Sequence, residues 1–129
     1  MARLLIDTHV LIWTLGDHAK LPGKIKALLE DRKNAVFVSA VTAWEIAIKV
    51  GIDKLDFDRE FLADFDSSIK QYEWSPLHVI AAHGAHSLHL PNTHKDPFDR
   101  LLGAQAQFER MILVSNDIAF ERLGVETIW

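Results

Sequence analysis

Four acidic residues occupy positions at which a metal-dependent site could form: Asp7, Glu45, Asp99 and Asp117. Two of them follow short apolar runs, residues 4–6 and 111–114, that have the length of buried strands. Carboxylates that are packed together repel one another, so such a cluster needs cations. Oxygen-only ligand sets suit Mg²⁺ or Mn²⁺, and these ions can activate water and stabilise the departing oxygen of a phosphodiester. The four acids therefore suggest metal-assisted phosphodiester hydrolysis.

Each of these acids also has an ordinary structural explanation. Asp7 and Asp117 each precede a predicted helix and could simply cap its first turn. Glu45 and Lys49 have the i,i+4 spacing of a surface ion pair, although Glu45 lies in an apolar stretch where an unpaired charge is costly. The residue types and their spacing leave both explanations open.

Short apolar runs alternate with helical patterns along the chain, and this alternation predicts how the acids are positioned. The runs predict strands at residues 4–6, 36–38, 73–74, 111–114 and 125–128. The helical patterns cover residues 8–16, 22–33, 39–51, 58–72, 76–87, 96–109 and 118–123, with proline expected at the first helical position at Pro22, Pro76 and Pro97. Such an order predicts a three-layer α/β/α fold, in which a central parallel sheet carries helices on both faces. Functional groups then gather at the carboxyl ends of the strands.

The composition is that of a soluble globular chain, and residues 1–129 are expected to form a single domain. Apolar residues make up 49% and charged residues 25%, with a formal net charge of −4. The negative charge argues against a bulk polycationic nucleic-acid binder, but not against an enzyme that holds nucleic acid through metal ions. Cysteine is absent, which excludes disulfides, thiolate zinc sites and cysteine nucleophiles. Without a membrane-length apolar run or a signal peptide, the chain is expected in the cytoplasm, with no membrane partner.

Four segments give the sequence a resemblance to a known family. They are residues 4–13, with Asp7 beside Thr8; residues 38–49, with Glu45; residues 94–106, with Asp99; and residues 113–117, which end in Ser-Asn-Asp. In this order and spacing they resemble the PIN domain family, in particular the VapC-like ribonuclease toxins of bacterial toxin–antitoxin pairs. The resemblance extends from Leu4 to about Trp129.

The resemblance implies an endoribonuclease that depends on a divalent metal, Mg²⁺ or Mn²⁺, and cleaves RNA phosphodiester bonds by metal-activated water. It implies that Asp7, Glu45, Asp99 and Asp117 are the catalytic acids and metal ligands, directly or through water. It also implies a homodimer that a partner antitoxin protein holds inactive. Asp96, which lies three residues before Asp99, is ranked second to it and could be a helix cap, an outer-sphere group or a ligand.

Other polar and aromatic residues lie close to the acids in the sequence. Thr8 and Asn116 are expected to orient the acids or their waters. The residues that could neutralise the acids or contact substrate are Lys49, His94, Lys95 and Arg100. For Trp13 and Trp44, core packing is the expected role, and stacking on a nucleic-acid base is the alternative.

Two other functions fit part of the pattern. A phosphatase or receiver-like domain also places Asp after parallel strands, but Asp7-Thr8-His9 does not supply the second acid that an aspartate nucleophile needs. A PIN fold that only binds proteins is the other alternative, although acids at all four positions count against it. The scattered glycines do not form a phosphate-binding loop.

Overall fold

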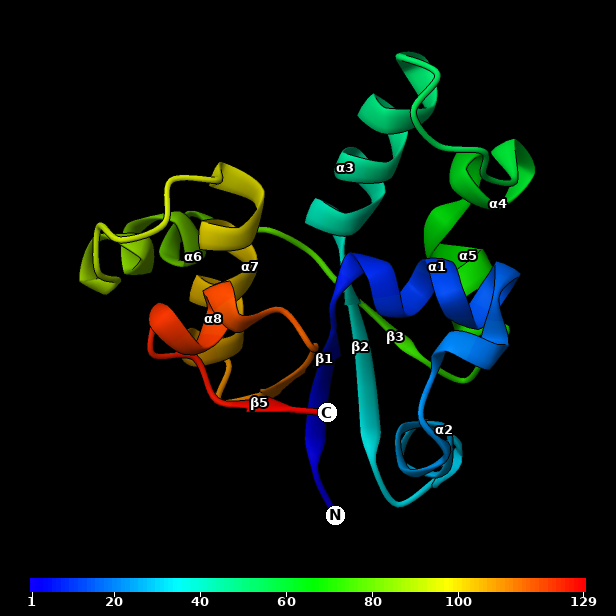
Figure 1. Ribbon diagram of the computed structural model, residues 1–129, viewed down its shortest axis with the longest axis horizontal. Helices are drawn as coiled ribbons and strands as arrows, with labels where there is room; N and C mark the ends of the chain where they lie inside the picture. The colour runs from blue at the N-terminus through cyan, green and yellow to red at the C-terminus, as the bar shows by residue number, and fades with distance from the viewer.

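The computed structural model describes residues 1–129, and its centre is one five-stranded parallel sheet in the order β3-β2-β1-β4-β5 (Figure 1). The strands are β1 (Arg3–Ile6), β2 (Ala35–Ser39), β3 (Ser75–Leu77), β4 (Ile112–Val114) and β5 (Thr127–Ile128). The α-helices are α1 (Thr8–Gly16), α2 (Gly23–Glu30), α3 (Ala40–Gly51), α4 (Arg59–Ala63), α5 (Phe65–Lys70), α6 (Ala81–His86), α7 (Pro97–Phe108) and α8 (Ile118–Arg122). Two one-turn 3₁₀ helices lie at His18–Lys20 and Ser87–His89.

The central strand β1 divides the core into two layers because its side chains alternate between the faces of the sheet. Leu4 and Ile6 pack with buried residues of α1, α2, α3 and α5 on one face. Leu5 packs on the other face with buried residues of α7 and α8, and α6 lies against α7. Figure 1 shows the sheet between these two groups of helices. The predicted α/β/α fold with a parallel sheet is therefore confirmed.

The expected helix over residues 58–72 is interrupted. Asp58 does cap a helix, accepting from the backbone N–H groups of Glu60 and Phe61, but α4 ends at Ala63 and α5 begins at Phe65. The Ser68 hydroxyl donates to the Phe61 carbonyl over 3.2 Å, so a side chain here binds a backbone carbonyl. Serine and aspartate compete with the helix for its backbone hydrogen bonds, and this segment is rich in both.

The predictions for residues 73–87 are wrong at the start of the segment. The strand is Ser75–Leu77 rather than residues 73–74, and Pro76 lies within it, paired with Val38, instead of opening a helix. Proline has no N–H to donate, but β3 is an edge strand, where that loss is tolerated. The helix begins only at Ala81, where Nδ1 of His83 accepts from the N–H of Ile80. Pro22 is likewise displaced by one position, since it precedes α2 as its N-cap.

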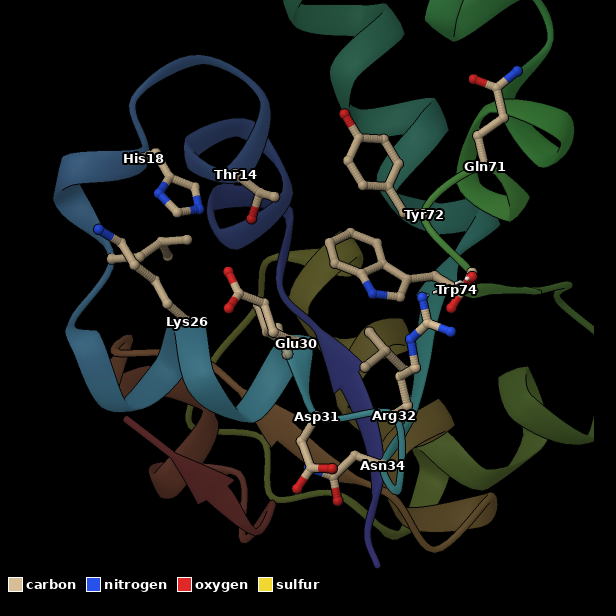
Figure 2. Close-up of a pocket in the computed structure, with 14 residues that line it drawn as sticks. Thr14, His18, Lys26, Glu30, Asp31, Arg32, Asn34, Gln71, Tyr72 and Trp74 are labelled. Atoms are coloured by element: carbon tan, nitrogen blue, oxygen red, sulfur yellow. Dashed lines mark ion pairs between the residues drawn. The ribbon is translucent and has the colours of Figure 1, made fainter.

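A cavity of about 480 Å³ lies between α2, the end of α1 and the segment that leads into β3 (Figure 2). Its acidic side chains, Glu30, Asp31 and Glu73, are accompanied by basic ones, and Glu73 pairs with Arg32 at 3.3 Å. None of the four predicted acids lines it, so this cavity is separate from the site described below.

None of the helices is both long enough and apolar enough to cross a lipid bilayer.

Candidate active site

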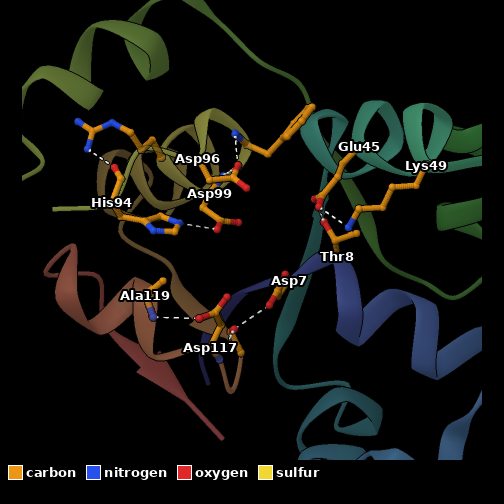
Figure 3. Close-up of polar contacts among 12 residues, drawn as sticks. Asp7, Thr8, Glu45, Lys49, His94, Asp96, Asp99, Asp117 and Ala119 are labelled. Carbon is orange, nitrogen blue, oxygen red and sulfur yellow. Dashed lines mark hydrogen bonds and ion pairs between the residues drawn. The ribbon is translucent and has the colours of Figure 1, made fainter. Parts of the chain in front are cut away.

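The pairing of β1 with β4 brings two sequence-distant acids to one edge of the sheet. Ile6 lies opposite Val114, and the Asp7 N–H donates to the Val114 carbonyl over 3.1 Å. The buried Ser115 hydroxyl donates to the Asp7 carboxylate over 2.7 Å and accepts from the Asp117 N–H over 3.0 Å. Figure 3 shows Asp7 and Asp117 near one another, beyond the carboxyl ends of the two paired strands. The expectation that these two strands end side by side is confirmed.

Asp7 occupies the N-cap position of α1, but its carboxylate does not cap the helix. Its side chain makes no capping hydrogen bond, and the residue is only 5% exposed. Burial raises the pKa of the Asp7 carboxyl, and the nearby Glu45 raises it further, while the Ser115 hydrogen bond and His9 act in the opposite direction. A buried carboxylate without a capping role is the kind of group that a cation would stabilise.

Glu45 reaches this edge from α3. The Ser39 hydroxyl caps α3 by accepting from the Val41 N–H, and Ile46 and Val50 bury one face of the helix against the core. The Thr8 hydroxyl donates to one Glu45 oxygen over 2.7 Å, and the Lys49 ammonium lies 2.9 Å from the other. Glu45 therefore forms the expected i,i+4 ion pair with Lys49 and also reaches the edge of the sheet where Asp7 lies.

Asp99 faces the same space from the first turn of α7. Nε2 of His94 lies 2.7 Å from its carboxylate. Burial is the main cause that raises the pKa of Asp99 to about 6, and the neighbouring Asp96 and Asp7 raise it as well. Asp96 is the N-cap of α7, because its carboxylate accepts from the N–H groups of Phe98 and Asp99 over 2.9 and 3.2 Å.

Three of the four acids form one electrostatic group. The charge of Glu45 raises the pKa of Asp7, and the charge of Asp7 raises the pKa of Asp99. Asp117 is exposed and caps α8 by accepting from the Ala119 N–H over 2.9 Å.

The donor set of this group suits a hard divalent cation, because it consists of buried and partly buried carboxylate oxygens. No three acidic or histidine side chains stand close enough to hold one ion as arranged. Each carboxylate is instead engaged by a neighbour: Asp7 by Ser115, Glu45 by Lys49 and Asp99 by His94. The hydrogen bonds from Ser115 and His94 and the ammonium of Lys49 stabilise carboxylates that would otherwise repel one another.

Arg100 has a different place from the one expected near substrate. Its guanidinium donates to the backbone carbonyls of Ser87, Leu90, Pro91 and His94, over distances from 2.7 to 3.5 Å. The Ser87 carbonyl belongs to the 3₁₀ helix Ser87–His89, and the other three belong to the loop that connects this helix to α7. Arg100 therefore fixes the loop that carries His94 against Asp99.

Replacing Arg100 with methionine is expected to lower the free energy of unfolding by about 2 kcal/mol, since several carbonyls lose a charged donor. Chemical denaturation measures this change. Arg122→Met removes the same charge from an exposed position at the end of α8 and is the matched control, expected within about 0.5 kcal/mol of the unmodified protein. Equal effects of the two substitutions would contradict the role of Arg100 in fixing the loop that carries His94.

The raised pKa of Asp99 predicts a pH dependence of stability in the absence of metal. A carboxyl whose pKa is about 6 in the folded chain, against an ordinary 3.8, stabilises the fold while it is protonated. That contribution is fully present below pH 3.8 and is lost as the pH rises through 6. Between about pH 5 and pH 7 the loss amounts to about 1 kcal/mol. Thermal unfolding in a chelator should show it, and Asp99→Asn should flatten the profile; an equally steep profile in that variant would contradict the prediction.

Two of the expected residues are exposed, namely Asn116 and Lys95. The buried Ser115, next to Asn116, is the residue that holds Asp7. Trp13 packs against the core and Trp129 as expected, but Trp44 is 61% exposed and is not a core residue.

Sequence reasoning missed three residues around the acids. These are Ser115, which binds Asp7; Thr42, whose hydroxyl lies 3.1 Å from that of Thr8; and His9, whose charge acts on Asp7. The signal for Ser115 was present, because it opens the Ser-x-Asp segment on which the family resemblance partly rests.

Comparison with known proteins gives a consistent family. The family model described as the PIN domain matches residues 4–126. Ribonuclease VapC16 of Mycobacterium tuberculosis is 34% identical to the chain over 61 residues, which are 47% of the chain and 43% of that relative. The match therefore spans less than half the length of this relative.

Solved structures resemble the chain over nearly its whole length. The DNA-bound VapBC structure from Salmonella typhimurium matches with a TM-score of 0.73 at 20% identity, covering 99% of the chain and 98% of the compared chain. VapBC-1 from nontypeable Haemophilus influenzae matches with a TM-score of 0.72 at 15% identity, covering 98% and 96%. At these identities the likeness supports the fold alone.

Proposed function

Because the chain belongs to the PIN domain family, we propose that it is an endoribonuclease that uses a divalent metal ion to hydrolyse RNA phosphodiester bonds. The observation that carries this proposal is the electrostatic group formed by Asp7, Glu45 and Asp99 at the carboxyl edge of the sheet. These acids come from three separate elements, and burial holds the pKa of two of them above its ordinary value. One buried and two partly buried carboxylates beside one another are costly to maintain for stability alone, so a role in binding cations explains them best.

The proposed roles follow from the contacts. Asp7, Glu45 and Asp99 would hold the ion, directly or through waters that span the space between them, and Asp117 would reach it through water. Mg²⁺ is the favoured ion and Mn²⁺ the alternative, and when bound it would supply positive charge to the phosphate and activate the attacking water. Ser115 orients the Asp7 carboxylate, Thr8 orients Glu45, and His94 holds Asp99.

Lys49 is proposed to have two partners. It compensates the charge of Glu45 in the metal-free protein, at 2.9 Å. Once a cation takes over that compensation, the Lys49 ammonium is free to contact an RNA phosphate, which lysine does without regard to base sequence.

The same proposal extends to the biological setting. The family and the likeness to a VapC ribonuclease and to VapBC structures support a toxin of a toxin–antitoxin pair. The partners would be an RNA substrate, a cognate antitoxin protein and a second copy of the chain, and the site of action would be the cytoplasm.

The test is cleavage of end-labelled single-stranded RNA by the purified protein with Mg²⁺, with Mn²⁺ and with excess chelator. Cleavage should require the ion. Because water rather than the ribose 2′-hydroxyl is the proposed nucleophile, a substrate with one 2′-deoxy residue at the cleavage site should still be cut, without a 2′,3′-cyclic phosphate. Cleavage in chelator that yields cyclic phosphate would overturn the mechanism. Absence of cleavage with either ion would favour a PIN fold that only binds proteins.

A further inference from the structure

An aromatic pair lies next to the acidic group and has no role in the core. Trp44 on α3 is 61% exposed, and its ring lies 5.0 Å from the ring of Phe98 on α7, at an interplanar angle of 68°. Each ring belongs to the residue immediately before an acid of the site, Glu45 and Asp99 respectively. The pair therefore bridges the two helices that carry these acids.

The position of the ring follows from helix geometry. Successive residues of a helix point about 100° apart, so Trp44 faces outward while Glu45 reaches Thr8 at the sheet edge. An edge-on contact with Phe98 leaves at least one face of the indole uncovered by that partner. A large aromatic ring left exposed in this way gains little from folding, so packing does not explain it.

Basic side chains accompany the two acids that follow the aromatic pair in the sequence. Lys49, one turn beyond Glu45 on α3, pairs with that acid at 2.9 Å, and the exposed Lys95 immediately precedes the N-cap of α7. Basic groups bind phosphates, whereas a flat ring binds bases of any identity by stacking. Basic side chains and an exposed aromatic ring together would provide for both parts of one nucleotide.

We propose that Trp44, held in place by Phe98, stacks on an unpaired base of the RNA next to the phosphate that faces the acids. The inference rests on the proposed ribonuclease function and narrows its substrate to single-stranded RNA, because a base within a duplex has no free face to offer. It makes Trp44 a substrate-binding residue without preference for one base.

A protein partner is the competing occupant. Ile48 and Ile52, 39% and 56% exposed, continue from Trp44 along α3 at intervals of one turn. A protein docked on this helix face would need all three side chains, whereas a stacked base needs Trp44 alone. Of Trp44, Ile48 and Ile52, only Trp44 has a ring contact with Phe98, and it is the one nearest the acids. This placement favours the base.

The test measures RNA binding in an Asp7→Asn background, in which the substrate stays intact and one negative charge near the phosphate is removed. Fluorescence anisotropy with a labelled single-stranded oligoribonucleotide in Mg²⁺ gives Kd. Trp44→Ala should weaken binding about 10-fold, and Trp44→Phe should restore most of it. Each base of the oligoribonucleotide is then replaced in turn by an abasic ribose. At one position, this replacement should weaken binding about 10-fold for the protein that keeps Trp44. At the same position, it should leave the Kd of the Trp44→Ala protein nearly unchanged.

Ile52→Ala is the matched control on the same helix face and should leave Kd unchanged. Equal Kd values for the protein that keeps Trp44 and for its Trp44→Ala variant would overturn the stacking role and leave the proposed function standing. Equal losses for Trp44→Ala and Ile52→Ala, together with a change in oligomeric state, would assign the surface to a protein partner instead. Failure of the protein that keeps Trp44 to bind RNA at all would count against the proposed function itself.

Discussion

Replacing Asp7 with asparagine is expected to reduce RNA cleavage on the order of 100-fold or more and to make the metal-free protein more stable. Asparagine keeps the shape of the side chain and can still accept the Ser115 hydrogen bond, but it removes a charge that is buried beside Glu45. Loss of that charge weakens a hard-cation site and also relieves the desolvation that raises the pKa of Asp7. Cleavage assays in Mg²⁺ and melting temperature in chelator measure the two effects separately.

The melting temperature of the Asp7→Asn protein should rise by about 3 °C in chelator, an amount that corresponds to about 1 kcal/mol in a chain of this size. Asp31→Asn is the matched control, because Asp31 is exposed and lies away from the acids, against the cavity between α2 and β3. It should change neither cleavage nor melting temperature appreciably. Full cleavage by the Asp7→Asn protein in added Mg²⁺ would contradict the proposed role of Asp7.

The two acids at the start of α7 should separate in their effects. Asp99→Asn is expected to remove most metal-dependent cleavage without lowering stability, because the carboxylate belongs to the acidic group and its burial already disfavours the charge. Asp96→Ala is expected to lower the free energy of unfolding by about 1 kcal/mol, because it deletes the cap of the helix, with a smaller loss of cleavage.

Thermal unfolding and RNA cleavage of both variants give independent measurements. The reverse pattern, in which Asp96 is essential for cleavage and Asp99 only for stability, would show that the acid of the third family segment was assigned to the wrong residue. Loss of cleavage in both variants with little change in stability would mean that Asp96 and Asp99 act as one unit.

The parts of the fold that the sequence predicts well are those set by local signals. The apolar runs at β1 and β4 are short and mostly buried. Caps such as Ser39 and Asp96 mark helix starts by side-chain chemistry alone. Because parallel strands share an orientation, the acids after β1 and β4 had to meet at one edge once the two strands paired.

The parts that the sequence does not predict depend on tertiary context. Pro76 is compatible with a helix start and with an edge strand, and only its pairing with Val38 decides between them. Residues 58–72 keep a helical spacing of apolar residues across a break in the backbone. Likewise, nothing in the spacing of Arg100 indicated that it would bind four backbone carbonyls. Those partners lie 6 to 13 residues away, and three of them belong to a loop without regular structure.

The bond between Ser115 and Asp7 joins residues 108 positions apart, and this has a consequence for protein synthesis. A ribosome must translate the chain past β4 before the central strand can acquire its second neighbour, so β1 waits with one edge unpaired while most of the chain is made. Non-local pairings of this kind slow folding, because the intervening chain must be ordered first. The acidic group therefore assembles late, and a nascent chain that stops before β4 holds Asp7 and Glu45 without the serine that orients Asp7.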